Sequence, residues 1–140
     1  MITEDYVSFE TAKLLKEKGF DAYCHSHYYP YYEDDTMKNK NYDRYRGTVN
    51  IKNKLYYEVY DRKGLMRDHY LCPTLQMAMK WLREVHSLWC EISWEGKGLW
   101  CMEVFSLMDE EFIPDSIVHE IKSYEEACES AIKYCLKNLI

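Results

Sequence analysis

The sequence predicts one α+β domain over residues 1–140, with three helices packed on an antiparallel sheet of two hairpins in a two-layer arrangement. Three observations support this class. Helix-start and helix-stop residues flank amphipathic segments, glycine turns interrupt two runs of alternating apolar and polar residues, and each hairpin passes into a helix. The length of 140 residues suits a single domain.

The first predicted helix covers residues 8–18. Ser8 can accept a hydrogen bond from a free N–H of the first turn. Gly19 supplies the left-handed residue that ends many helices, and Phe20 can then fold back on Leu15. The segment carries apolar residues at helical spacing: Phe9, Ala12 and Leu15.

The next two segments and the first hairpin follow. Residues 22–29 are predicted to be a short extended segment, whereas residues 30–47 are polar and tyrosine-rich without a clean period and are predicted to be a long loop. From residue 49 apolar and polar residues alternate, residues 61–64 have turn chemistry, and residues 65–71 return. This pattern predicts a hairpin.

The second helix is predicted over residues 74–88, with Lys80, Glu84 and Ser87 facing water. Its apolar stripe consists of Leu75, Ala78, Leu82, Val85 and Trp89.

A second hairpin follows around a turn at residues 95–98. Its predicted apolar face carries Cys90, Ile92 and Trp94 on the first strand and Leu99, Cys101 and Phe105 on the second.

A weak strand is predicted over residues 117–121, before a final helix over residues 124–138. Ser123 and Glu126 have the spacing of a capping box, in which each side chain can bond the other residue's backbone N–H.

Charge and cysteine usage limit the classes of function. The net charge of −6 disfavours duplex nucleic acid as a partner, because the averaged field repels phosphate. No apolar run has the length of a membrane span, and no secretory signal is expected. The six cysteines include no C-x-x-C pair, which predicts reduced thiols and a cytoplasmic protein.

Three helical segments carry a resemblance to a known family. They are Val7–Asp21 (VSFETAKLLKEKGFD), Pro73–His86 (PTLQMAMKWLREVH) and Ser123–Glu129 (SYEEACE). The chain resembles a family of small uncharacterised proteins of gut anaerobes, their bacteriophages and mobile elements. The resemblance implies a cytoplasmic accessory protein and transfers no catalytic residues.

Tyrosines are concentrated in one quarter of the chain, where seven of the 14 tyrosines lie. Tyrosine offers flat apolar area and a hydroxyl at low entropic cost, which is typical of contact surfaces. We therefore predict a contact surface in segment 23–46 and the adjoining hairpin, and expect a homo-oligomer or a host or phage protein as partner. Its predicted binding residues are Tyr28, Tyr29, Tyr31, Tyr42, Arg44, Tyr45 and Arg46.

Two alternatives stay open at this stage. Cations interleave with aromatic residues at Lys38, Lys40, Tyr42, Arg44, Tyr45 and Arg46, a mixture that suits a nucleotide-like ligand. In a strand, His25 and His27 would point the same way and could share a metal ion in a metal-dependent enzyme.

The remaining histidines indicate no chemistry. His86 is expected to be a hydrogen-bonded core residue, and His69 and His119 have no companions in the sequence. We expect no cofactor or metal, and predict a non-catalytic protein that acts by binding.

Overall fold

The computed structural model describes residues 2, 4–22, 24, 26–32, 40–46 and 70–140. The described elements are, in chain order, α1 (Phe9–Glu17), β1 (Ser26–Tyr32), β2 (Lys40–Arg46), β3 (Tyr70–Leu71), α2 (Leu75–His86), β4 (Leu88–Gly96), β5 (Leu99–Ser106), β6 (Glu111–Phe112), β7 (Val118–Ile121) and α3 (Tyr124–Asn138). All strand pairs among the described residues are antiparallel, and the described part of the chain has three helices, which confirms the α+β class.

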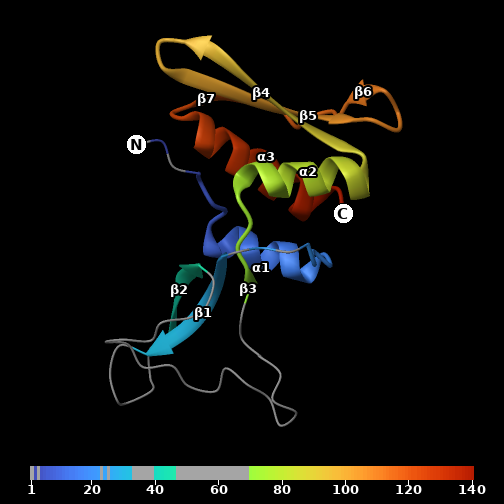
Figure 1. Cartoon of the computed structure of the whole chain (residues 1–140). Helices are drawn as coiled ribbons and strands as arrows, with labels where there is room; N and C mark the ends of the chain where they lie inside the picture. The colour runs from blue at the N-terminus through green and yellow to red at the C-terminus, as the bar shows by residue number, and fades with distance from the viewer. Residues whose placement is uncertain (1, 3, 23, 25, 33–39, 47–69) are drawn as a thin grey trace.

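The described strands divide between two sheets rather than forming one. A three-stranded sheet has the order β2-β1-β3, and a larger sheet has the order β4-β5-β6 with β7 also paired to β5. Figure 1 shows the larger sheet at one end of the molecule, β1 and β2 at the other, and the helices between them. The predicted two-layer arrangement is therefore not confirmed.

The prediction for residues 22–47 needs correction. Residues 26–32 and 40–46 form the paired strands β1 and β2, although a long loop was expected from residue 30. Tyrosine at successive positions suits a pleated strand but hides the apolar–polar alternation by which strands are found. Of the first predicted hairpin, residues 49–69 lie outside the described residues, and β3 is its last part.

Helix α1 begins and ends as predicted. The Ser8 side chain accepts from the Thr11 N–H. At the other end Gly19 has φ +86°, the Phe20 N–H donates to the Leu15 carbonyl at 2.9 Å, and the Gly19 N–H donates to the Lys16 carbonyl at 3.2 Å. These two bonds define a Schellman ending and satisfy carbonyls that the helix leaves free.

Helix α3 has the predicted bounds and half of the predicted capping box. The Ser123 hydroxyl accepts from the Glu126 N–H at 3.1 Å, and the helix spans Tyr124–Asn138. The return bond from the Ser123 N–H to the Glu126 carboxylate is not present among the described residues. It packs against α1, α2 and the larger sheet. Its buried face consists of Ala127, Cys128, Ala131, Ile132, Cys135 and Leu136.

Helix α2 is capped by Thr74, whose hydroxyl accepts from the Met77 N–H at 3.1 Å, but its apolar stripe differs from the prediction. Val85 is 61 % exposed, whereas Trp81 is buried, with its ring edge-on to Phe20. The left-handed Ser87 (φ 56°) ends the helix, so Val85 lies in its last turn and Trp89 belongs to β4. The buried residues of α2 are Leu75, Ala78, Trp81 and Leu82.

Among the described residues, no helix combines the length and the apolar character that crossing a membrane requires.

Candidate functional site

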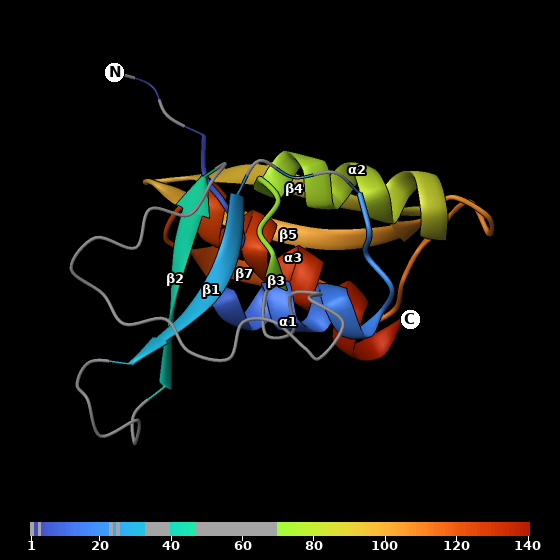
Figure 2. The ribbon, with the colours of Figure 1, turned by 60° about the horizontal axis from the view of Figure 1, so that its bottom comes forward.

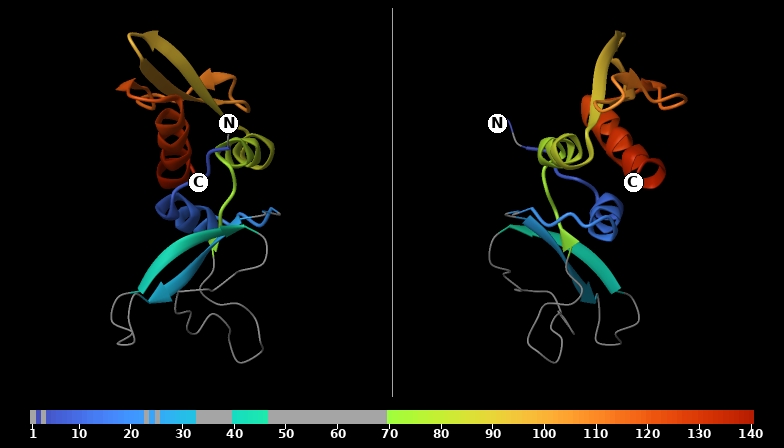
Figure 3. Two further views of the ribbon diagram at one scale, coloured as in Figure 1. Left: turned by 60° about the vertical axis from the view of Figure 1, so that its left-hand side comes forward. Right: turned by 90° about the vertical axis from the view of Figure 1, so that its right-hand side faces the viewer.

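The predicted contact surface corresponds to β1 and β2, which we call the tyrosine strand pair (residues 26–32 and 40–46). In the order β2-β1-β3, β2 has a described partner on one side only. Figure 2 shows β1 and β2 side by side, and Figure 3 shows them on the opposite side of the helices from the larger sheet. The described part of the chain therefore places this pair at the periphery, with β2 as an edge strand.

The register of the pair divides the predicted binding residues between two faces. Tyr28 lies opposite Arg44, and Tyr29 lies opposite Asp43. Alternate strand positions belong to opposite faces. One face therefore holds the positions of Tyr28, Tyr42, Arg44 and Arg46, and the other holds those of Tyr29, Tyr31 and Tyr45.

This division separates charges that are adjacent in the sequence. Asp43 lies next to Arg44 along the chain, but its strand position shares a face with Tyr29 and not with Arg44. Lys40 falls on the face of Arg44 and Arg46. The acidic position within the basic segment is thus on the opposite face from the arginine positions.

The proposed histidine pair is only partly described. His27 lies opposite Tyr45 on β2 and Leu71 on β3. His25 and Lys38 lie outside the described residues. Cys24 is buried, and its thiol lies 3.3 Å from the Ala22 carbonyl.

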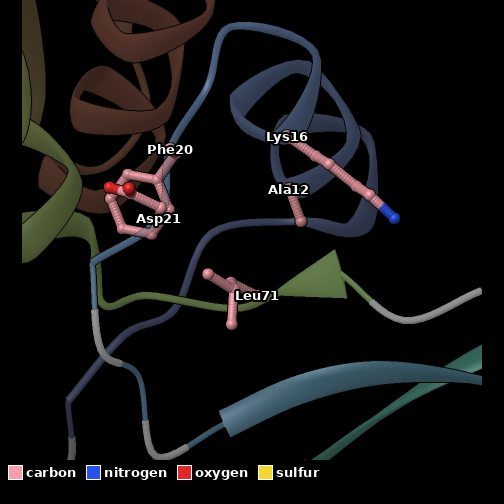
Figure 4. A pocket seen from close by; sticks show the side chains of 5 residues that line it. All are labelled: Ala12, Lys16, Phe20, Asp21 and Leu71. Atoms are coloured by element: carbon pink, nitrogen blue, oxygen red, sulfur yellow. The ribbon is translucent and has the colours of Figure 1, made fainter. Parts of the chain in front are cut away.

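A small pocket of roughly 190 Å³ lies where α1, the segment after it and β3 meet. Figure 4 shows Phe20 and Asp21 on one side of it and Lys16 extending away from them. Ligand pockets usually measure about 300–1,000 Å³, so this pocket is too small to enclose a nucleotide. Its lining residues are Ala12, Lys16, Phe20, Asp21 and Leu71.

A second group of candidate side chains, which the sequence did not reveal, lies on the larger sheet. The register pairs Cys101 with Ser93 and Phe105 with Trp89. The prediction that Cys101 and Phe105 share a face with Cys90 and Ile92 is therefore wrong. The face toward α3 and the core instead carries Cys90, Ile92, Met102 and Val104.

A β-bulge in β4 causes this change of face. Trp94 lies opposite Trp100 and Gly96 opposite Leu99, so Glu95 is an extra residue between two paired positions. Lys97 and Gly98 then turn the chain with positive φ values of 54° and 73°. An extra residue reverses the inside–outside alternation, which sequence spacing alone does not reveal.

A second irregularity lies across β5. Trp100 lies opposite Ile121 and Met102 opposite Val118, so His119 and Glu120 together face the single residue Cys101. Glu120 has φ +58°, an uncommon conformation for a residue with a side chain. The two irregularities therefore flank Cys101 from both neighbouring strands.

This arrangement brings Glu95, Cys101 and His119 together. One potential ligand atom of each residue lies within 4.8 Å of the other two. His119 Nδ1 is 2.9 Å from Glu95 Oε2, and the Glu120 N–H donates to Glu95 Oε1 at 2.9 Å. We call these three residues the bulge cluster; His119, expected to have no companion, has two.

The environment of the bulge cluster differs between its members. Cys101 is 7 % exposed, whereas the side chains of Glu95 and His119 are 30 % and 56 % exposed. Two hydrogen bonds lower the pKa of Glu95, the larger effect coming from the Glu120 N–H and the smaller from His119. Burial raises the pKa of the Cys101 thiol; the Glu95 carboxylate raises it further, against a hydrogen bond from Ser93 that lowers it. Cys101 is therefore a protonated thiol near neutral pH rather than an activated nucleophile.

His86 differs from its prediction. It is the last residue of α2, its ring lies edge-on to Trp81 with centroids 4.6 Å apart, and its Nε2 has no hydrogen-bond partner among the described residues. It packs as an aromatic ring rather than as a hydrogen-bonded core histidine.

Comparisons with protein-family models, curated proteins and solved structures give no match for this chain.

Proposed function

We propose that this chain is a non-catalytic accessory protein that acts by binding another protein chain through the tyrosine strand pair. The observation that carries the proposal is the edge position of β2 among the described strands, in a sheet whose two longer strands contain the predicted binding tyrosines. The partner is a second copy of the chain or a protein of the host or phage.

The physical reason is the chemistry of a strand edge. An edge strand presents backbone N–H and C=O groups that another strand can pair with, and proteins commonly cover such an edge. A second copy related by a twofold axis offers the same edge. Tyrosines on both faces of the pair would add contact area at low entropic cost.

The cellular setting is part of the proposal. The resemblance of the three helical segments to proteins of phages and mobile elements supports an accessory role in the cytoplasm. All six cysteines are free and buried, which is consistent with a compartment that keeps thiols reduced.

Sedimentation velocity of the purified chain tests this proposal. We expect a dimer or larger assembly, and expect the triple substitution Tyr28→Ser, Tyr29→Ser and Tyr31→Ser to shift it toward monomer without changing helical content. Tyr134→Ser, on α3 and away from the strand pair, is the matched control. The proposal fails if two results are found together: the parent is a monomer at high concentration, and the triple variant binds host proteins as well as the parent does.

A nucleotide-like ligand is the second candidate, favoured by one observation. The register places Tyr28, Tyr42, Arg44 and Arg46 on one face of the strand pair and Asp43 on the other. Arginines can bind phosphate and tyrosines can stack on a base. Calorimetry with ATP distinguishes this candidate from protein binding. The nucleotide-like ligand is favoured if the parent binds ATP, Arg44→Ala abolishes that binding, and the matched Lys80→Ala on α2 retains it.

A further inference from the structure

We propose that the bulge cluster, Glu95, Cys101 and His119, binds one zinc ion. This inference concerns the larger sheet and is independent of the tyrosine strand pair. It rests on three donor types that converge from three adjacent strands and on the two register irregularities that bring them together.

The donor set selects the class of metal. Thiolate, imidazole and carboxylate are the ligands that zinc takes in proteins, whereas magnesium and calcium take oxygen ligands. Ligand atoms on a tetrahedral zinc ion are roughly 3.3–3.7 Å apart, given metal–ligand bonds of about 2.0–2.3 Å. The three atoms already lie within 4.8 Å of one another, so side-chain adjustments of about 1 Å complete the site.

The cluster is also partly oriented before metal arrives. The Glu120 N–H holds Glu95 Oε1 and leaves Oε2 directed at His119. Such outer hydrogen bonds orient a ligand and strengthen metal binding. Glu120, which donates this bond, has φ +58°. Uncommon backbone conformations of this kind persist where the surrounding structure imposes them, often at functional sites.

Charge and access agree with this assignment. When Cys101 binds as a thiolate, two negative ligands and one neutral imidazole neutralise the charge of a divalent ion. His119, with a side chain 56 % exposed, gives access from solvent. Three protein ligands leave a fourth position for water or a partner's side chain, so the ion would be exchangeable.

Cysteine nucleophilic catalysis is the competing explanation of the same residues. A nucleophilic cysteine needs a base that takes its proton and surroundings that stabilise the thiolate. His119 Nδ1 is hydrogen-bonded to Glu95 Oε2 at 2.9 Å. The imidazole is therefore paired with a carboxylate rather than with the Cys101 thiol, whereas a metal ion can bind all three side chains at once.

Cobalt absorption spectroscopy on the untagged full-length chain tests the proposal. We expect one Co²⁺ per chain, with a thiolate-to-cobalt band in the near ultraviolet, tetrahedral visible bands, and displacement by Zn²⁺ but not by Mg²⁺. Cys101→Ser should abolish the thiolate band. His119→Ala and Glu95→Gln should each weaken Zn²⁺ binding by more than about 100-fold, beyond the 10–100-fold typical of losing an outer hydrogen bond.

Matched variants distinguish this site from the histidine segment near β1. Cys24→Ser, His27→Ala and Glu103→Gln should keep the spectrum and the affinity. Any one of three results overturns the proposal: His27→Ala loses binding, Cys101→Ser keeps the thiolate band, or the parent binds no stoichiometric metal. His119→Ala is the decisive variant if Cys101→Ser does not fold, because His119 is exposed, and the circular dichroism of metal-free His119→Ala should match that of the parent.

Discussion

Replacement of Glu129 provides the sharpest test of how the helices are held together. Glu129 on α3 reaches across to the start of α1, where its Oε1 accepts from the Ser8 N–H at 3.0 Å and from the hydroxyls of Ser8 and Thr11. Thr11 is fully buried. A single carboxylate oxygen thus satisfies three donors and places a negative charge at the positive end of a helix.

The expected cost follows from these contacts. Hydrogen bonds to a charged group contribute about 1.5–3 kcal/mol, and a carboxylate near a helix N-terminus adds about 0.3–1 kcal/mol. Because the three bonds share one oxygen, they do not add independently. We expect Glu129→Ala to lower the free energy of unfolding by about 2–3 kcal/mol, and Glu129→Gln, which keeps a neutral acceptor, by about 1 kcal/mol.

Urea denaturation followed by circular dichroism measures both variants. Glu125→Gln, an exposed position on the same helix, is the matched control and should change stability by less than about 0.5 kcal/mol. In a double-mutant cycle, Thr11→Val should cost less in the Glu129→Ala background, with a coupling energy of at least about 1 kcal/mol. Additive effects of the two substitutions would refute the contact between Glu129 and Thr11.

Three further predictions concern the cap of α3 and the buried thiols. Ser123→Ala should cost about 1 kcal/mol because the Glu126 N–H loses its acceptor, and an unchanged urea midpoint would contradict this role. Burial raises the pKa of Cys24 and of Cys128 to about 11 from 9.0, so the folded chain binds these two protons more tightly than the unfolded chain does. The contribution of this difference to the free energy of unfolding is complete below about pH 9 and is lost as pH rises toward 11. Over that window the free energy of unfolding should fall less in Cys128→Ala than in the parent. Equal decreases would count against the pKa shift. The folded thiols should also resist a thiol reagent that titrates all six in urea.

Local chemistry explains which elements could be predicted from the sequence. The ends of α1 and the start of α3 depend on residues within one or two turns, such as Ser8, Gly19 and Ser123, and their bonds are present as expected. Hydrogen bonds between residues that are distant in the chain could not be predicted in this way. The contact of Glu129 with Ser8 spans 121 residues and has no sequence pattern that announces it.

Register explains why the bulge cluster could not be predicted. Glu95 was assigned to a turn and Cys101 to the core face because strict alternation was assumed across residues 90–105. One extra residue in β4 invalidates that assumption, and another in β7 brings His119 beside Cys101. Bulges depend on the pairing of three strands, so they become visible only when the partners are known.

Hydrogen–deuterium exchange at two protein concentrations tests the central claim, that the tyrosine strand pair is the binding surface, most directly. We predict that raising the concentration into the assembled range slows exchange of backbone amides in residues 40–46, because a second chain pairs with the edge of β2. Exchange in α3 should stay the same. Concentration-dependent protection that omits residues 26–32 and 40–46 and falls on β4 and β5 instead would contradict the claim.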